Sequence, residues 1–475
     1  MNRLGLLLAS LALGACASTG YKKPETPIPT GWESTRKSSA SETSDRSIAH
    51  QPWNEVFPIP ELTALIDEAL ANNTDILVAS QRVAIAGSQY GIVRSAIFPT
   101  LNANANFLRQ RSPGFNPQTN TISESTSFGL LSSSWEIDIW GKLRDQSEAA
   151  RNEYLASAAF YQAAQISLAA QVATLYLDLL DLDNQIQIST RTIEFRRKGL
   201  RINKARFEER IAPVLDVYQA ESLLASAQQI MYDQQRRLRL GENALSTLLG
   251  RNPGPIRRTT KLDSLRMPSD LYAGIPSELL ERRPDILGAE QALRGAYANV
   301  SAARKEFLPS LSLTTALGFA SPALGSLFQS GRYAWSLQPG LKTNIFTADR
   351  IAFGVEVAES EQEILVQEYK ATIRTAFKEV NDALINIEQR GLEKQAGERV
   401  VAANQARVKA SNARYLTGIA PFFEVLDAER QLLESQIVLS QSQRSEYQAA
   451  VELYRSLGGG WTKRDFQPAQ IRSPL

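Results

Sequence analysis

The chain has 475 residues, with 52 Lys or Arg against 50 Asp or Glu, and the formal net charge of +2 provides no basic field for nucleic acid. One Cys, Cys16, and one His, His50, exclude an internal disulfide framework and multi-cysteine metal sites, and argue against His-centred catalysis. A hydrophobic content of 43% with only 8% aromatics favours extended, thin-walled packing over several thick cores. We therefore expect no enzyme activity, no cofactor and no metal site.

Residues 1–15 are expected to be a secretory signal peptide. A positive charge at Arg3 precedes an apolar run over 4–13, which is too short for a permanent transmembrane helix, and small residues stand directly before Cys16. The segment resembles the bacterial lipobox, which implies that signal cleavage leaves Cys16 as the first residue and that Cys16 carries covalent lipid, which anchors the protein durably in a membrane. The alternative to lipidation is an ordinary signal peptide with a chance Cys at its end. Ala17, in place of Asp, favours the outer membrane within that resemblance.

An internal repeat of roughly 210 residues indicates a duplicated half-domain rather than a solenoid. Four segments match in the same order: 75–76 with 285–286, 98–101 with 308–311, 138–140 with 344–346, and 205–221 with 413–429. The predicted organisation is a signal peptide (1–15), a lipidated N-terminal tether (16–51), a first repeat (52–265), a second repeat (266–457) and a C-terminal tail (458–475).

Each repeat is predicted to run helix, strand, strand, long helix, turn, helix. Pro99 and Pro309 end the first helices, whereas Pro213 and Pro421 restart the chain after the longest ones. A helix over 142–206 would be on the order of 95 Å long. Apolar residues recur there in alternating steps of three and four, with Ser189 at one heptad position: Leu168, Val172, Leu175, Leu179, Leu182, Ile186 and Ile193. Phe377, Val380, Leu384 and Ile387 repeat the pattern, which predicts coiled-coil packing.

Period-two segments lie between these helices, which a cytosolic dimeric coiled coil would not explain. Apolar residues alternate with polar ones over 101–107 and again over 311–319, and return strands are expected at 121–139 and 333–345. The alternative is a soluble four-stranded sheet with one face on a core. Four strands cannot close a membrane barrel, whose smallest members have eight, so a barrel would need several chains, and three chains would supply twelve strands.

Three segments together carry a family resemblance: Pro276–Ile286 (PSELLERRPDI), Trp135–Gly141 (WEIDIWG) and Phe422–Glu429 (FFEVLDAE). The chain resembles the TolC/OprM-like outer-membrane factor family, in the lipoprotein (NodT) branch that serves resistance-nodulation-division (RND) efflux pumps. The resemblance implies an α+β membrane protein, internally duplicated, with four transmembrane strands and long coiled-coil helices per chain. It implies a homotrimer with a twelve-stranded β-barrel continuous with a periplasmic α-helical barrel, and an equatorial region that includes the C-terminal tail.

The same resemblance implies the partners and the place of action. The duct would stand in outer-membrane lipid, reach into the periplasm, and work with a periplasmic adaptor and an inner-membrane RND-type pump to export drugs or other small toxic compounds. One alternative is a duct for type I protein or peptide secretion, and another is a lipid-anchored coiled-coil scaffold without a channel. A third alternative, a lipoprotein hydrolase, would need a nucleophile with a base. The one His of the chain, His50, lies outside the periodic region, so we do not expect this activity.

The hairpin tips at 211–213 and 419–421 are the expected periplasmic gate and the expected adaptor contact. Glu424 and Asp427, spaced i and i+3, share a helix face, so three copies would set six mutually repelling carboxylates around the axis and favour bound cations. These positions resemble the acidic rings of the family's closed entrance. The alternative is that Glu424 only complements the helix dipole, worth about 0.3–1 kcal/mol.

The remaining gate candidates come from both repeats. Asp216 is the first-repeat equivalent of Glu424 and is expected to be a cap or a salt-bridge partner. Tyr415 matches a position where family members hold a gate hydrogen bond, with simple packing as the alternative. Arg206, Arg210 and Arg414 either complement the helix dipole or latch the closed state by bridging to Asp216 or Glu424.

Overall fold

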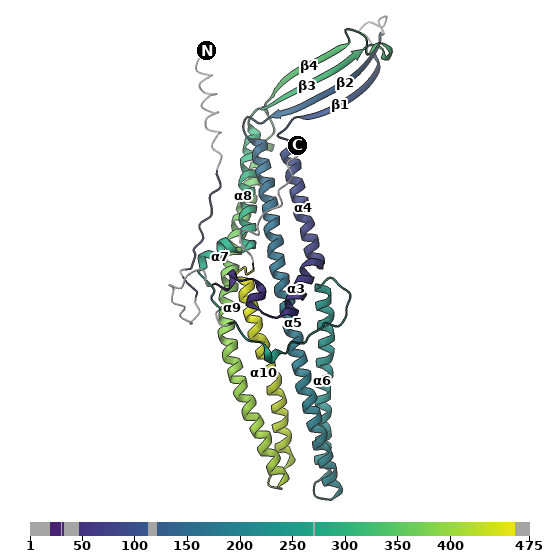
Figure 1. The fold of residues 1–475 in the computed structure, drawn as a ribbon. Helices are drawn as coiled ribbons and strands as arrows, with labels where there is room; N and C mark the ends of the chain where they lie inside the picture. Colours follow the sequence, from purple (N-terminus) through teal and green to yellow (C-terminus); the bar gives the residue numbers. More distant parts are fainter. Residues whose placement is uncertain (1–19, 30, 33–46, 113–120, 269–270, 461–475) are drawn as a thin grey trace.

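The computed structural model describes residues 20–29, 31–32, 47–112, 121–268 and 271–460, without the side chains of 106–112 and 121–131. The signal peptide and Cys16 lie outside these residues. The molecule is elongated, with a sheet at one end and helical hairpins at the other (Figure 1). The helices are α2 (Trp53–Val56), α3 (Pro60–Asn72), α4 (Thr74–Ser95), α5 (Lys142–Glu208), α6 (Val214–Leu248), α7 (Pro276–Arg282), α8 (Pro284–Arg304), α9 (Arg350–Leu416) and α10 (Phe422–Ser456). The strands are β1 (Thr100–Ser112), β2 (Thr121–Ile137), β3 (Ser310–Ser321) and β4 (Tyr333–Lys342).

The two repeats fold alike, as their matching segments predict. Helices α5 and α9 each have 67 residues, and α6 and α10 each have 35. Pro213 and Pro421 are the N-cap residues of the shorter helices. A 67-residue helix is about 100 Å long, so the chain forms two long antiparallel hairpins, α5–α6 and α9–α10 (Figure 1).

Heptad positions of the long helices face the core, as their spacing predicts. Leu168, Val172 and Leu179 of α5 are buried in one cluster with Phe377 and Val380 of α9. Among the described residues, α5 alone has an apolar window that would suit a membrane span by length and composition. Because apolar residues of α5 such as Leu168, Val172 and Leu179 pack in this cluster, we assign the window to the helical core.

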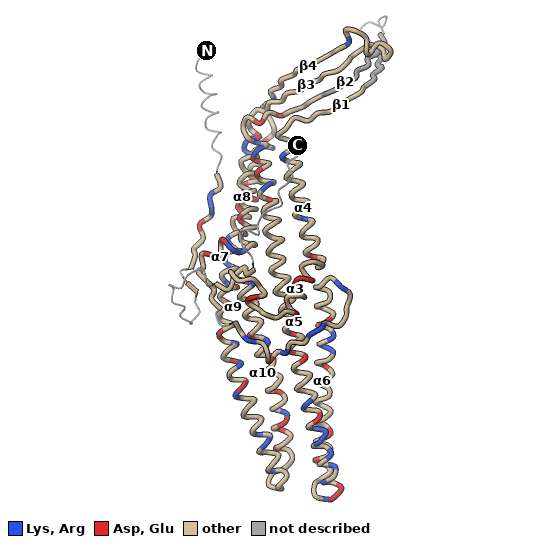
Figure 2. Tube along the Cα trace, in the orientation of Figure 1, with Lys and Arg blue, Asp and Glu red and all other residues tan. Residues whose placement is uncertain are grey.

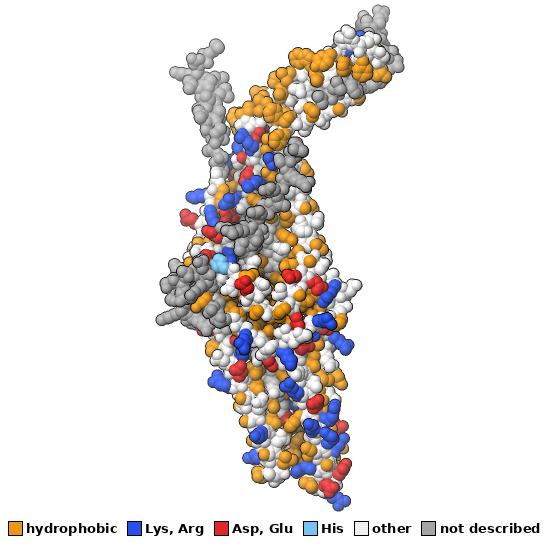
Figure 3. All heavy atoms as spheres, viewed as in Figure 1, with side chains coloured by type: hydrophobic (Ala, Val, Ile, Leu, Met, Phe, Trp, Pro, Cys, Tyr) orange, Lys and Arg blue, Asp and Glu red, His pale blue; other side chains and the backbone are white. Residues whose placement is uncertain are grey.

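The sheet is antiparallel in the order β1-β2-β3-β4, so β2 and β3 join the two repeats. One face is apolar: Leu317 of β3 pairs with Trp335 of β4, and Leu311 pairs with Leu341. Trp335 is 71% exposed and Leu341 74%, and hydrophobic side chains gather over the described part of the sheet (Figure 3). Strand β3 carries no charged residue and β4 only Lys342 (Figure 2). The soluble sheet of the alternative interpretation would have buried this apolar face on a core.

The described part of the tether lies along the helices. The Trp32 indole N–H donates to the Gly274 carbonyl oxygen at 2.9 Å, and Lys23 pairs with Glu290 of α8 at 3.1 Å. The Tyr21 ring packs edge-on against Tyr297, with a centroid separation of 5.5 Å. Aromatic anchors therefore fix a segment that has no periodic pattern of its own.

Candidate gate at the helical hairpin tips

The two hairpins meet near their tips through Tyr415. Its hydroxyl lies 2.7 Å from Asn203 Oδ1 of α5 and 3.0 Å from Asp216 Oδ2 of α6, and its single proton is shared between these acceptors. Tyr415 and Asp216 are buried, and Asn203 is only 1% exposed. Burial and then the hydrogen bond to Asp216 raise the pKa of Tyr415 to about 12, so the hydroxyl remains a donor at neutral pH.

Ring contacts hold Tyr415 in place. Its centroid lies 5.1 Å from that of Phe422, which begins α10, and the Arg206 guanidinium stacks over its face at 4.8 Å. The expected gate hydrogen bond is thus matched by geometry, whereas its role in gating stays a prediction. Asp216 lies in the first turn of α6, where its charge also complements the helix dipole as expected, and the hydrogen bond from the Tyr415 hydroxyl is a contact that the sequence did not predict for it.

The latch predicted for the three arginines needs correction for two of them. Within the described residues, no ion pair joins Arg206 or Arg210 to Asp216 or Glu424. Arg206 instead stacks on Tyr415. Arg210 is exposed at the hairpin turn with φ 59°, at the position where the second repeat has Gly418 with φ 77°. Only Arg414 pairs as predicted, with its Nε 3.4 Å from Glu424 Oε2.

The second predicted carboxylate, Asp427, is neutralised within its own hairpin. Arg407 of α9 reaches its Oδ2 at 2.5 Å, and Arg430, one turn further along α10, reaches Oδ1 at 3.0 Å. Hydrogen bonds from Arg430 and Arg407 lower the pKa of Asp427. These arginines place positive charge beside Asp427, and the binding of cations by three copies of the gate carboxylates stays a prediction. The sequence analysis identified neither arginine: Arg430 lies three residues after Asp427 on α10, and Arg407 lies on the other arm of the hairpin.

A buried ion pair joins the hairpins above Tyr415 and was missed from the sequence. Arg196 of α5 is 3% exposed, and its Nε lies 3.6 Å from Glu429 Oε2 of α10. Arg196 also donates from Nη1 to the Leu223 carbonyl oxygen at 2.7 Å. Burial raises the pKa of Glu429 to about 7, because this distant partner compensates only part of the cost of burying the carboxylate.

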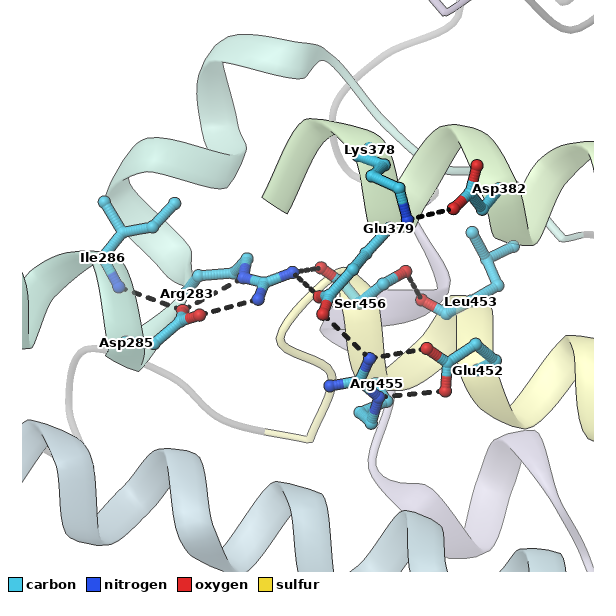
Figure 4. A network of polar contacts seen from close by, with 10 residues as sticks. All are labelled: Arg283, Asp285, Ile286, Lys378, Glu379, Asp382, Glu452, Leu453, Arg455 and Ser456. Atoms are coloured by element: carbon cyan, nitrogen blue, oxygen red, sulfur yellow. Dashed lines mark hydrogen bonds and ion pairs between the residues drawn. The ribbon is translucent and has the colours of Figure 1, made fainter. Parts of the chain in front are cut away.

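The Arg282–Asp285 segment of the resemblance lies at the equator of the molecule, where Arg283 ties three elements together (Figure 4). Its guanidinium holds Asp285 bidentately at 3.0 and 2.7 Å, and Nη1 donates to Glu379 of α9 at 2.7 Å and to the Ser456 carbonyl oxygen of α10 at 2.9 Å. Arg283 is 6% exposed, and these partners raise its pKa although burial opposes the shift. The motif residue is therefore a structural junction.

An uncovered sheet with one apolar face, continued by long helical hairpins, is the protomer architecture of an outer-membrane channel. Residues 65–251 and 275–459, one segment from each repeat, match a family model described as "Outer membrane efflux protein". The chain belongs to this family and is an outer-membrane efflux component.

Known proteins are similar in sequence and structure to almost the whole chain. The probable efflux pump outer membrane protein TtgC of Pseudomonas putida is 33% identical over 99% of both chains. A membrane protein from Pseudomonas aeruginosa superposes with a TM-score of 0.86 at 31% identity, covering 92% of this chain and 99% of that one. The open state of the Neisseria gonorrhoeae MtrE outer membrane channel superposes with a TM-score of 0.82 at 31% identity, covering 93% and 97%.

Proposed function

We propose that three copies of this protein form the exit duct of a tripartite efflux system that carries drugs, organic solvents or other small toxic compounds to the exterior. The observation that carries the proposal is the sheet: it has an apolar exposed face and leaves β1 and β4 as free edges. Three such sheets would supply the twelve strands of a closed barrel and remove every edge. A relative in Pseudomonas putida is named a toluene efflux pump outer membrane protein, which supports small apolar cargo.

The duct would work with a periplasmic adaptor at the hairpin tips and an inner-membrane RND-type pump. We place the gate at the same tips, where Tyr415 bridges one hairpin to Asn203 and Asp216 of the other. Opening would separate these packed hairpins when the adaptor binds the open arrangement more tightly than the closed one. Covalent lipid on Cys16 would hold the tether to the outer membrane, and no catalytic step is required.

Export in cells tests this proposal. The protein would be expressed in a host that lacks its own outer-membrane efflux protein but retains an adaptor and a pump, and toluene survival and retention of a fluorescent pump substrate would be measured. We expect survival to rise and retention to fall. Unchanged survival and retention, with the protein present in the outer membrane, would contradict the proposal.

A matched pair of strand variants tests the orientation of the sheet. Trp335→Arg places a charge on the apolar face, where an arginine at the bilayer midplane costs about 2–4 kcal/mol, and we expect loss of outer-membrane protein and of export. Ser336→Arg places the same charge on the opposite face of β4 and is expected to retain assembly. Equal tolerance of both variants would contradict a lipid-facing apolar surface.

A further inference from the structure

Helix α10 lies between α9 of its own hairpin and α5 of the other hairpin (Figure 1). A cavity of about 230 Å³ lies where these three helices meet. Its apolar lining residues come from all three helices: Ile188 and Phe195 of α5, Val408 of α9, and Leu432 and Leu433 of α10. The cavity therefore borders both hairpins of one chain.

The cavity has the size and the lining of a site for one small ring. An engineered apolar cavity of about 150 Å³ in another protein holds a benzene molecule, so a cavity of 230 Å³ has room for a ring with a short substituent. Val408 and Leu433 are buried, whereas Phe195 is 48% exposed and leaves an aromatic surface uncovered. A ring bound in the cavity would cover part of that surface.

Glu429 also lines this cavity, and its carboxylate is incompletely paired. The side chain is 10% exposed, and the Nε of its partner Arg196 lies 3.6 Å from Oε2, beyond hydrogen-bond distance. The buried Arg196 Nε–H has no hydrogen-bond partner, and within the described residues no group donates a hydrogen bond to the Glu429 carboxylate. An ionised carboxylate has about four lone-pair sites, so Glu429 can still accept hydrogen bonds from a molecule in the cavity.

The charges around the cavity favour a cationic ligand. Arg196 is already engaged, since its Nη1 and Nη2 donate to the backbone carbonyl oxygens of Leu223 and Glu429 at 2.7 and 3.4 Å. Of the described residues that line the cavity, Arg191 and Glu429 are the charged ones. Arg191 is exposed and can keep its guanidinium in water, whereas the Glu429 side chain is held in the wall. A positive group that donates hydrogen bonds therefore complements the site better than an anion does.

We propose that this cavity binds a small organic cation that has one apolar ring and a protonated amine. The ring would lie against Phe195 and Val408, and the ammonium group would donate hydrogen bonds to Glu429. Because the lining residues come from α5 of one hairpin and from α9 and α10 of the other, the bound molecule would contact both hairpins at once. The inference is independent of the proposed function, since a single chain provides the whole site.

Fluorine NMR titration of the purified protein in detergent tests the site. The cationic probe is 4-fluorobenzylamine, its neutral analogue is 4-fluorobenzyl alcohol, and uptake of each probe by protein-free micelles is subtracted. At pH 8 we expect saturable binding of the amine that is tighter than binding of the alcohol. Glu429→Gln keeps the shape of the side chain but removes its charge. It should weaken amine binding about tenfold or more, the effect of losing a hydrogen bond to a charged group, and leave alcohol binding unchanged.

Glu434→Gln is the matched control, because it removes a carboxylate from the same helix at a side chain that is 59% exposed. It should bind the amine as the wild type does. Burial raises the pKa of Glu429 to about 7, so amine affinity should rise about tenfold from pH 6 to pH 8 as the carboxylate ionises. Arg191 and Arg196 of α5 stay charged throughout this range, and Val408, the lining residue of α9, does not titrate. Glu429→Gln should therefore abolish the rise.

Equal amine affinity of the wild type and Glu429→Gln at pH 8 would overturn the proposal. So would an equal loss of affinity in Glu434→Gln, or the absence of saturable amine binding to the wild type. If Glu429→Gln does not fold, Phe195→Ala tests the same cavity at an exposed position. It should weaken the binding of both probes, and unchanged binding of both would overturn the proposal.

Discussion

Removing the Tyr415 hydroxyl should loosen the closed arrangement of the hairpin tips. Tyr415→Phe keeps the ring contacts with Phe422 and Arg206 but leaves Asn203 and Asp216 without the shared proton. A hydrogen bond to a charged group contributes about 1.5–3 kcal/mol, and these acceptors are buried. A loss of about 2 kcal/mol would lower the closed-to-open ratio of each chain roughly 30-fold.

The assay is single-channel recording of the purified protein in a planar bilayer. We expect the Tyr415→Phe protein to spend more time open, or to show larger resting currents, than the wild type. Tyr218→Phe is the matched control, because Tyr218 lies two residues after Asp216 but is 63% exposed, and it should behave as the wild type. Unchanged currents in a Tyr415→Phe protein with a wild-type melting curve would refute the assignment of Tyr415 to the closed state.

Three further changes test other parts of the account. The pKa of Glu429 is raised to about 7, so the folded state keeps a proton that the unfolded state releases near pH 4.5. The free energy of unfolding should therefore fall by about 3 kcal/mol as the pH rises from 4.5 to 7. Glu429→Gln should flatten this pH dependence in thermal melts. Retention of the wild-type pH slope in Glu429→Gln would contradict the assignment. Arg283→Met should lower the melting temperature, because removing one partner of a buried ionic network costs about 3–5 kcal/mol. Lys378→Met, which removes one partner of an exposed ion pair, is the control and should leave the melting temperature unchanged. Equal melting temperatures of the two variants would refute the role of Arg283 as a junction. Cys16→Ser should abolish the lipid mass increment in mass spectrometry, and persistence of that increment would exclude Cys16 as the attachment site.

The fold was largely predictable because its signals are local and repeated. The alternating steps of three and four set the buried face of α5, and the prolines at 213 and 421 set the starts of α6 and α10. Period-two alternation predicted strands with one apolar face, and β3 and β4 have that pattern. Such patterns involve residues only a few positions apart, so they can be recognised in a single sequence without an alignment.

The polar contacts were less predictable because they depend on helix register. Asp427 meets Arg407, 20 positions away on the antiparallel arm, and Arg196 meets Glu429 across 233 positions. Tyr415 was identified through the family resemblance, whereas its second acceptor, Asn203, had no distinguishing sequence context. The internal repeat could have indicated one of these contacts: Arg196 aligns with Asn404, and both side chains donate a hydrogen bond to the other helix of their own hairpin.

The most direct measurement is conductance of the wild-type protein across a planar bilayer, made on a preparation whose oligomeric mass has been determined. We expect three copies per particle and discrete, long-lived conductance steps whose size increases when the Tyr415 contact is removed. A folded trimer that carries no current, with or without Tyr415→Phe, would contradict the exit duct and leave a lipid-anchored helical scaffold as the better description.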